Sequence, residues 1–154
     1  MKPIGTRRAA VSDLPAIADL YLRARAAAYP AMPRGVHPPH EVREWVCGWD
    51  LSQTAVWVAE RDALLGYARI WQDWLEDLYV DPAHQGLGVG SRLLEEVKAQ
   101  RPHGFTLWVF ESNAPARAFY RAHGLVEVDR TDGAENEEKL PDVKMAWRGL
   151  VPAR

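Results

Sequence analysis

The chain has 154 residues, 47% of them hydrophobic, which is enough for one buried core but leaves little room for two, so we expect one domain over residues 1–154. Lysine and arginine total 19 against 21 for aspartate and glutamate, and this balance gives no basic excess that would favour nucleic-acid binding. The lone Cys47 favours a reducing compartment, the cytoplasm, and the sequence predicts no membrane span and no signal peptide.

The first half of the chain predicts a strand, two helices and an antiparallel meander. The strand covers residues 4–11, and Ser12 or Asp13 can cap a helix in which apolar residues recur at helical spacing. A proline-rich connection over residues 30–39 leads to a short helix over about 41–49. Three strand-like runs follow, the first two joined by a tight turn at Arg61 and Asp62, and they cover residues 55–60, 64–73 and 75–80.

The second half alternates helices with strands after a glycine-rich turn. A helix over residues 91–100 carries Leu93, Leu94 and Val97 on one face, and a strand over 106–110 follows. A second helix over 114–123 ends at Gly124. Two last strands, over 125–129 and 143–147, flank a polar loop or hairpin tip at 131–142. This order predicts a mixed α/β fold with a strand, glycine turn, helix and strand at its centre.

The glycine turn reads Gln85-Gly86-Leu87-Gly88-Val89-Gly90 and sits between an apolar strand and an amphipathic helix. Small residues let the backbone approach a ligand, and successive N–H groups at a helix N-terminus bind a pyrophosphate. A P-loop would need Lys and then Ser or Thr after the last glycine, and a dinucleotide fingerprint would need G-x-G-x-x-G, so both alternatives are weak. The remaining alternative is that the glycines only make a tight connection.

Two segments resemble one known family. Residues 75–90 resemble the acetyl-CoA-binding core of the GNAT N-acetyltransferase superfamily, whose turn reads Q/R-x-x-G-x-G/A and is matched by Gln85, Gly88 and Gly90. Residues 107–125 resemble the family's next strand, asparagine-containing loop and tyrosine-bearing helix, although Leu125 replaces the usual Phe. The resemblance implies a mostly antiparallel twisted sheet with one splayed parallel strand pair at the CoA site, flanked by about four helices. From residue 75 to 128 the match is specific, whereas the first half matches only in the order of its elements.

The resemblance also implies how acetyl-CoA, the co-substrate, is held. The backbone of Leu78, Tyr79 and Val80 would pair with the pantetheine arm as an added strand does. The turn and the start of its helix would bind the pyrophosphate, and the next helix would add two contacts; these residues are Gln85, Gly86, Leu87, Gly88, Val89, Gly90, Ser91, Asn113 and Ala116. Asn113 is also a good helix N-cap, which is its alternative role.

An amine that attacks the thioester needs a base, and the leaving thiolate needs an acid. Tyr120 stands where the family places its acid, although a tyrosine on a helix face is more often part of a core. Glu76 is our first choice of base, because the string 75–80 resembles polyamine acetyltransferases whose base is this Glu. Asp77 is the second choice, and since adjacent strand residues point to opposite faces, only one of the two is expected at the acceptor unless a bulge intervenes. Water could also serve, and the alternative for both acids is a solvated strand edge or a salt bridge.

The acceptor cannot be read from the sequence, and small amines, polyamines, antibiotics and protein or peptide amines all stay open. The family builds this pocket from parts that here contain Arg34, His37, His40, Trp71, Trp74, Glu135, Glu137 and Glu138, each of which has a surface or core role as its alternative. We expect no metal site, and Cys47 and most of the seven tryptophans are expected to be buried. The prediction is an N-acetyltransferase acting on a primary amine, as a monomer or homodimer; the alternative is a non-catalytic acyl-CoA-binding module.

Overall fold

The computed structural model of the protein describes residues 2–150 and forms four helices and seven strands there. In chain order these are β1 (Gly5–Arg8), α1 (Leu14–Ala28), α2 (Pro39–Cys47), β2 (Ala55–Arg61), β3 (Ala63–Trp71), β4 (Trp74–Val80), α3 (Val89–Gln100), β5 (Phe105–Phe110), α4 (Ala114–Ala122), β6 (Val126–Thr131) and β7 (Asp142–Trp147). Short 3-10 turns lie at Val11–Asp13 and Pro82–His84. No helix within the described residues is long and apolar enough to cross a membrane.

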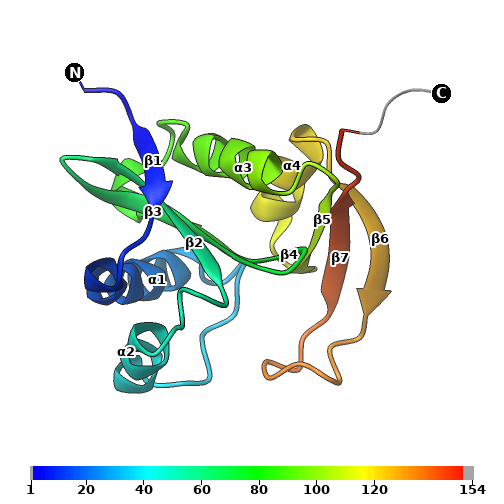
Figure 1. Cartoon of the computed structure of the whole chain (residues 1–154). Helices are drawn as coiled ribbons and strands as arrows, with labels where there is room; N and C mark the ends of the chain where they lie inside the picture. Colours follow the sequence, from blue (N-terminus) through cyan, green and yellow to red (C-terminus); the bar gives the residue numbers. More distant parts are fainter. Residues whose placement is uncertain (1, 151–154) are drawn as a thin grey trace.

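All seven strands form one sheet in the order β1-β2-β3-β4-β5-β7-β6. Every neighbouring pair is antiparallel except β4 and β5, which run parallel. Helices α1 and α2 lie on one side of the sheet, and α3 and α4 on the other (Figure 1). The mixed α/β class, the mainly antiparallel sheet and its one parallel pair are therefore as predicted.

Each helical layer buries its apolar face against the sheet. Under α1 and α2 the core contains Ile17, Leu20 and Val46, and under α3 and α4 it contains Leu93 and Leu94, all fully buried. Each such leucine or isoleucine contributes about 1.5–3 kcal/mol by leaving water. The helical spacing of these residues explains why the sequence predicted the helices themselves.

Several boundaries differ from the predicted ones for local reasons. Helix α2 begins at Pro39, two residues early, because proline is compatible with a first helical turn. Helix α3 begins at Val89, two residues before the predicted start. Its N-cap is Gly88, which has a left-handed conformation that glycine adopts readily. Asp13 precedes α1 but does not cap it with its side chain, since its carboxylate accepts from the Ala10 N–H and pairs with Arg7 at 2.8 Å.

The expected burial of the tryptophans and of Cys47 was wrong. None of the seven tryptophans is fully buried; cations cover several of them, as Arg8 does Trp57 at 5.7 Å and Lys98 does Trp147 at 5.2 Å. An indole gains from such a cation while it keeps an edge in water, so Trp49, Trp57 and Trp147 pack against the core but are only partly buried. Cys47 is exposed because it lies at the end of α2, off the face that Val42 and Val46 bury.

Candidate functional site

Strands β4 and β5 meet at one end and separate toward the other. Trp74 and Thr106 are the one registered pair between them within residues 2–150, supported by a 2.9 Å hydrogen bond from the Thr106 N–H to the Asp73 carbonyl. A cavity of about 230 Å³ is walled by both strands and by α1 and α4. Its walls include Tyr21, Arg25, Glu76, Asp77, Leu78, Tyr79, Trp108, Val109, Asn113, Ala116, Tyr120, Glu138 and Asp142.

The separation leaves one edge of β4 without a strand beside it. On its other edge β4 pairs with β3, as Leu78 with Ala68, Tyr79 with Tyr67 and Val80 with Gly66. No strand pair with β5 is formed beyond Trp74 in the part of the chain that the structure describes. An extended ligand can therefore hydrogen-bond to the free edge as an added strand, which is the role predicted for residues 78–80.

The glycine turn has the shape that a phosphate group needs. Gly86 and Gly88 have φ of +80° and +79°, and a Cβ added to either would meet no atom within 4 Å, so open space lies over the turn. The first turn of α3 leaves the N–H groups of Val89, Gly90 and Ser91 without helical acceptors. A second cavity, of about 400 Å³, is lined by Gln85, Gly86, Gly88, Val89, Gly90 and Ser91, with His84 and Phe119.

Two residues of this turn have other surroundings than expected. Leu87 is exposed and does not line the cavity, so only its backbone remains a candidate for binding. A Cβ on Gly90 would come within 3.4 Å of the Phe119 ring, so this glycine lets α4 pack closely against α3.

Helix α4 presents three predicted residues on one face. Asn113, Ala116 and Tyr120 all line the cavity between β4 and β5, as helical spacing requires. Asn113 does cap α4, because its side-chain oxygen accepts from the Ala116 N–H at 3.3 Å. Burial, and secondarily the negative charge of Asp77, raise the pKa of Tyr120, so its phenol keeps the proton that an acid would donate.

Glu76 occupies a β-bulge in β4. Asp77 pairs with Arg69 and Leu75 pairs with Ile70, so Glu76 is the extra residue between two registers. The bulge interrupts the strict alternation of faces, and both Glu76 and Asp77 line the same cavity. Glu76 is exposed, whereas Asp77 is buried and accepts hydrogen bonds from Arg69 Nε at 2.8 Å and from the Tyr67 hydroxyl at 3.1 Å.

Carboxylates outnumber cations in the cavity wall. Arg25 is the cation among its lining residues, and the acids are Glu76, Asp77, Glu138 and Asp142. Three of these acids have partners: Glu138 lies 3.8 Å from Arg25, Asp77 binds Arg69, and Asp142 accepts from Thr131 and Asn136. Among the described residues Glu76 makes no hydrogen bond or ion pair, so its lone pairs are free for a substrate proton.

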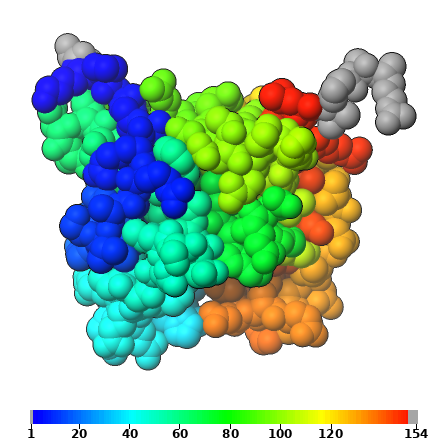
Figure 2. All heavy atoms as spheres, viewed as in Figure 1, coloured from blue at the N-terminus to red at the C-terminus, as the bar shows by residue number. Residues whose placement is uncertain are grey.

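A further cavity, of about 430 Å³, adjoins the first and shares Tyr21, Arg25 and Glu138 with it. Arg34, His37 and Glu137 line it, and His37 bridges two segments: Nδ1 is 3.1 Å from Glu41, and Nε2 is 3.1 Å from Glu137. In Figure 2 the α1–α2 connection (light blue) meets the β6–β7 connection (orange) at the bottom of the view.

The remaining predicted acceptor residues lie away from both cavities. His40, Trp71 and Glu135 are exposed and line neither of them. Trp74 also lines neither cavity; it stacks on Trp108 with ring centroids 6.4 Å apart and an interplanar angle of 11°.

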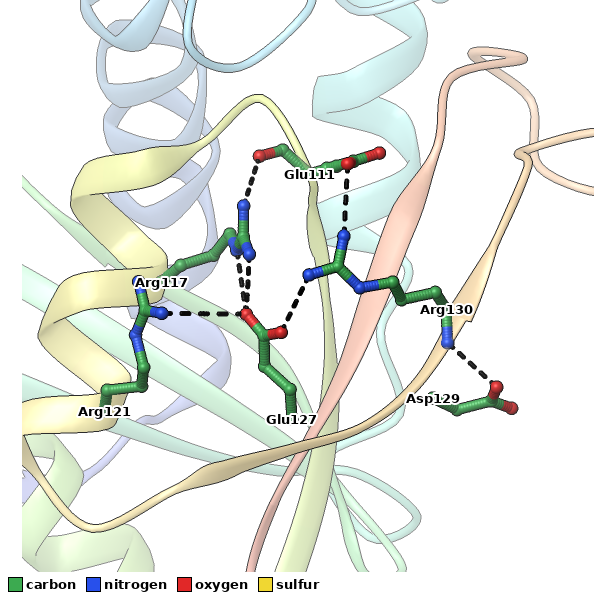
Figure 3. Close-up of polar contacts among 6 residues, drawn as sticks. All are labelled: Glu111, Arg117, Arg121, Glu127, Asp129 and Arg130. Carbon is green, nitrogen blue, oxygen red and sulfur yellow. Dashed lines mark hydrogen bonds and ion pairs between the residues drawn. The ribbon is translucent and has the colours of Figure 1, made fainter.

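Helix α4 is anchored to β6 by the charged cluster drawn in Figure 3. Glu127 of β6 accepts from Arg117 Nη2 of α4 at 2.7 Å and from Arg130 Nη2 at 3.0 Å. Arg117 also donates to the Glu111 carbonyl, and Arg130 pairs with the Glu111 carboxylate at 3.1 Å. These contacts fix the helix that places Tyr120 in the cavity.

Comparison with known proteins identifies the family. Residues 52–127 match the model of the acetyltransferase (GNAT) domain. The peptidyl-lysine N-acetyltransferase YiaC of Escherichia coli K12 is 32% identical over 143 residues, which cover 92% of this chain and 94% of that protein. The chain belongs to the GNAT acetyltransferase family.

Solved structures have the same fold. The apo form of YjaB from Escherichia coli superposes with a TM-score of 0.77 at 22% identity, over 97% of this chain and all of that one. The acetyltransferase yncA of Salmonella typhimurium, solved with acetyl-CoA, superposes with a TM-score of 0.73 at 22% identity, over 99% of this chain and 98% of that one. The GNAT protein described here is therefore an acetyl-CoA-dependent acyltransferase, and the alternative of a non-catalytic module is not supported.

The sequence alone did not indicate several residues that form this GNAT site. Tyr21 and Arg25 were not singled out, although their i, i+4 spacing on α1 places them on one face of the helix. The Arg69–Asp77 pair and Trp108 were also missed, because no local pattern reports which strand residues meet across a sheet. Within residues 2–150 no group of three or more His, Cys, Asp or Glu side chains could hold a metal ion.

Proposed function

We propose that this protein acetylates a primary amine by direct attack on acetyl-CoA in a ternary complex, and that the amine is a lysine side chain of a peptide or protein. One observation carries the proposal: Glu76, which makes no hydrogen bond or ion pair among residues 2–150, and Tyr120, a buried phenol with raised pKa, line one cavity where β4 and β5 separate. The excess of carboxylates there favours a cationic acceptor. Two relatives, YiaC and YjaB of Escherichia coli, are named peptidyl-lysine N-acetyltransferases, which supports the acceptor class.

The donor would be held by the backbone and the reaction carried by two side chains. The free edge of β4 at residues 78–80 binds the pantetheine arm, residues 85–91 bind the pyrophosphate, and Asn113 and Ala116 border the arm. Glu76 takes a proton from the ammonium, and the nitrogen attacks the thioester carbonyl. As the C–N bond forms, the C–S bond breaks and the sulfur takes the Tyr120 proton; the acylated nitrogen loses its extra proton to the tyrosinate or to solvent.

The experiment is a measurement of CoA release and of acetyl-lysine formation with acetyl-CoA and a panel of lysine peptides, free lysine, polyamines and α-amino peptides. Acetylation of lysine peptides with a kcat/KM well above that of the other amines would support the proposal. Replacing Glu76 with Gln should lower kcat by about 10²-fold or more and remove the acid-side limb of the pH–rate profile. Tight acetyl-CoA binding without turnover on any amine would contradict it.

Three broader expectations belong with this proposal. We infer a single domain, a cytoplasmic location, and a monomer or homodimer that needs no nucleic acid. Light scattering after size exclusion, limited proteolysis and cell fractionation would test these, and a higher oligomer, a stable proteolytic subdomain or an exported protein would contradict the respective expectation.

A further inference from the structure

Asp77, immediately after the bulge, is tied to strand β3 by two hydrogen bonds to the same oxygen. Arg69 Nε donates to Oδ2 at 2.8 Å, and the Tyr67 hydroxyl donates to it at 3.1 Å. The side chains of Arg69 and Asp77 are only 15% and 8% exposed, so the ion pair is largely withdrawn from water. A carboxylate in this position needs its cation, because an unpaired buried charge is strongly unfavourable.

Arg69 in turn is held by Trp45 of α2 and by Trp49, which follows the helix. Its guanidinium lies 4.7 Å from the ring centroid of Trp49 and 5.2 Å from that of Trp45, and these two rings meet edge to face at 5.2 Å. Trp45 also packs edge to face against Tyr21, which lines the reaction cavity; their ring centroids are 6.0 Å apart. Contacts thus run without a break from the helix at the acceptor side, through Arg69, to the carboxylate beside Glu76.

The position of this pair within the sheet gives it a role. Glu76 has no cross-strand partner in β3. The direction in which its side chain points therefore depends on the two flanking pairs, Leu75 with Ile70 and Asp77 with Arg69. The bulge survives only while both registers hold, and a slip of one residue would send the side chain to the other face. The Arg69–Asp77 ion pair joins the very residues that define the register after the bulge.

We propose that Arg69 and Asp77 are positioning residues that hold the β4 bulge so that Glu76 faces the acceptor amine, and that Asp77 is not the base. This inference rests on the proposed function, in which Glu76 removes the substrate proton. The hydrogen bonds from Arg69 and Tyr67 hold the Asp77 carboxylate toward β3, whereas the carboxylate of Glu76 makes no hydrogen bond or ion pair among the described residues. Through Arg69, the pair also connects α2 to the segment of β4 that carries Glu76. Acceptor binding and removal of the acceptor proton therefore depend on the same contacts.

The test compares Arg69→Gln, Asp77→Asn and the double variant with the wild type. Arg69→Gln leaves the buried Asp77 carboxylate without its cation. It should lower kcat/KM for a lysine peptide about tenfold or more, with KM for acetyl-CoA nearly unchanged. Adding Asp77→Asn should restore most of the loss, because two amides can hydrogen-bond without charge. The double variant should keep the acid-side limb of the pH–rate profile, since Glu76 is intact.

A second pair of variants isolates the contact with α2. Trp49 does not line the reaction cavity, so Trp49→Ala should raise KM for the peptide, while Trp49→Phe keeps a ring beneath Arg69 and should change it little. Circular dichroism and thermal melting confirm that each variant folds.

Loss of about 10²-fold or more in Asp77→Asn and in the double variant, together with loss of the acid-side limb, would make Asp77 the base and overturn the proposal. Hydrogen exchange separates this inference from the proposed function, because it needs no acceptor. The amides of residues 74–80 should exchange faster in Arg69→Gln and return toward wild-type rates in the double variant. Unchanged exchange would overturn the positioning role even if peptides are acetylated, and failure to acetylate any amine would overturn the proposed function alone.

Discussion

At the residue scale, the two reactive candidates differ in their surroundings as an acid and a base should. Tyr120 is buried, and its raised pKa keeps the phenol protonated through the neutral range; the same shift weakens it as an acid, so the site must stabilise the tyrosinate as the proton passes to the thiolate. Glu76 is exposed on a bulge, with a free carboxylate. Such opposed environments are the usual way in which a site assigns acid and base roles.

Removal of the Tyr120 hydroxyl should therefore affect chemistry and not donor binding. We expect Tyr120→Phe to lower kcat by about 10²-fold, because general acid catalysis typically contributes that much or more. The Kd of acetyl-CoA, measured by calorimetry, should hardly change. Tyr79→Phe is the matched control, since its phenol lines the same cavity. Equal rates for wild type and Tyr120→Phe would exclude Tyr120 as the acid.

At the element scale, the pyrophosphate turn depends on the N-terminal end of α3, and Tyr120 depends on the anchor of α4. The turn before α3 is open because glycine adopts the left-handed conformation, and α4 stays beside the cavity because Arg117 and Arg121 of this helix pair with Glu127 of β6. Both features can be tested without touching a reacting group.

A side chain at Gly88 should strain the turn. With φ at +79° an alanine costs about 1 kcal/mol or more, although its Cβ has room. For a domain of this size we expect Gly88→Ala to lower Tm by about 2–4 °C and to raise KM for acetyl-CoA more than KM for the amine. Gly5→Ala, at an ordinary φ and with no atom within 4 Å of the new Cβ, is the control. A Gly88→Ala variant with unchanged donor KM would contradict the role of the turn.

The anchor of α4 should respond to acid. Hydrogen bonds from Arg117, and secondarily from Arg130, lower the pKa of Glu127. A carboxylate whose pKa is depressed on folding stabilises the native state above its usual pKa and loses that contribution as pH falls through the lowered value. We expect the urea midpoint of the wild type to drop more steeply between about pH 6 and pH 3 than that of Glu127→Gln. Glu44→Gln, on the exposed face of α2, should follow the wild type; identical slopes in all three proteins would refute the anchor.

At the scale of the whole molecule, two connections distant in sequence meet at the cavity that His37 and Glu137 line. Hydrogen bonds to Glu41, and secondarily to Glu137, raise the pKa of His37. The bond to Glu137 ties the α1–α2 connection to the β6–β7 connection. A group whose pKa is raised on folding stabilises the native state fully below its usual pKa and loses that contribution as pH rises through the raised value. The tie should therefore be strongest in mild acid.

Hydrogen exchange of residues 132–141, corrected for intrinsic rates, would measure this. We expect greater protection at about pH 6 than at about pH 8.5 in the wild type, and no such difference in His37→Gln. His40→Gln, a change at a nearby exposed histidine, should behave as the wild type does. Protection that is independent of pH in the wild type would show that His37 does not hold the two connections together.

Local patterns in the sequence determined the order of elements, the four helices, the glycine turn and the family, because periodicity, caps and short motifs depend on neighbours along the chain. Tertiary structure alone decided the bulge at Glu76, the Arg69–Asp77 pair, the contributions of Tyr21 and Arg25 to the cavity, and the exposure of Cys47 and the tryptophans. These depend on which distant segments meet, and register across a sheet or packing between helices leaves no periodic trace in a single strand or helix.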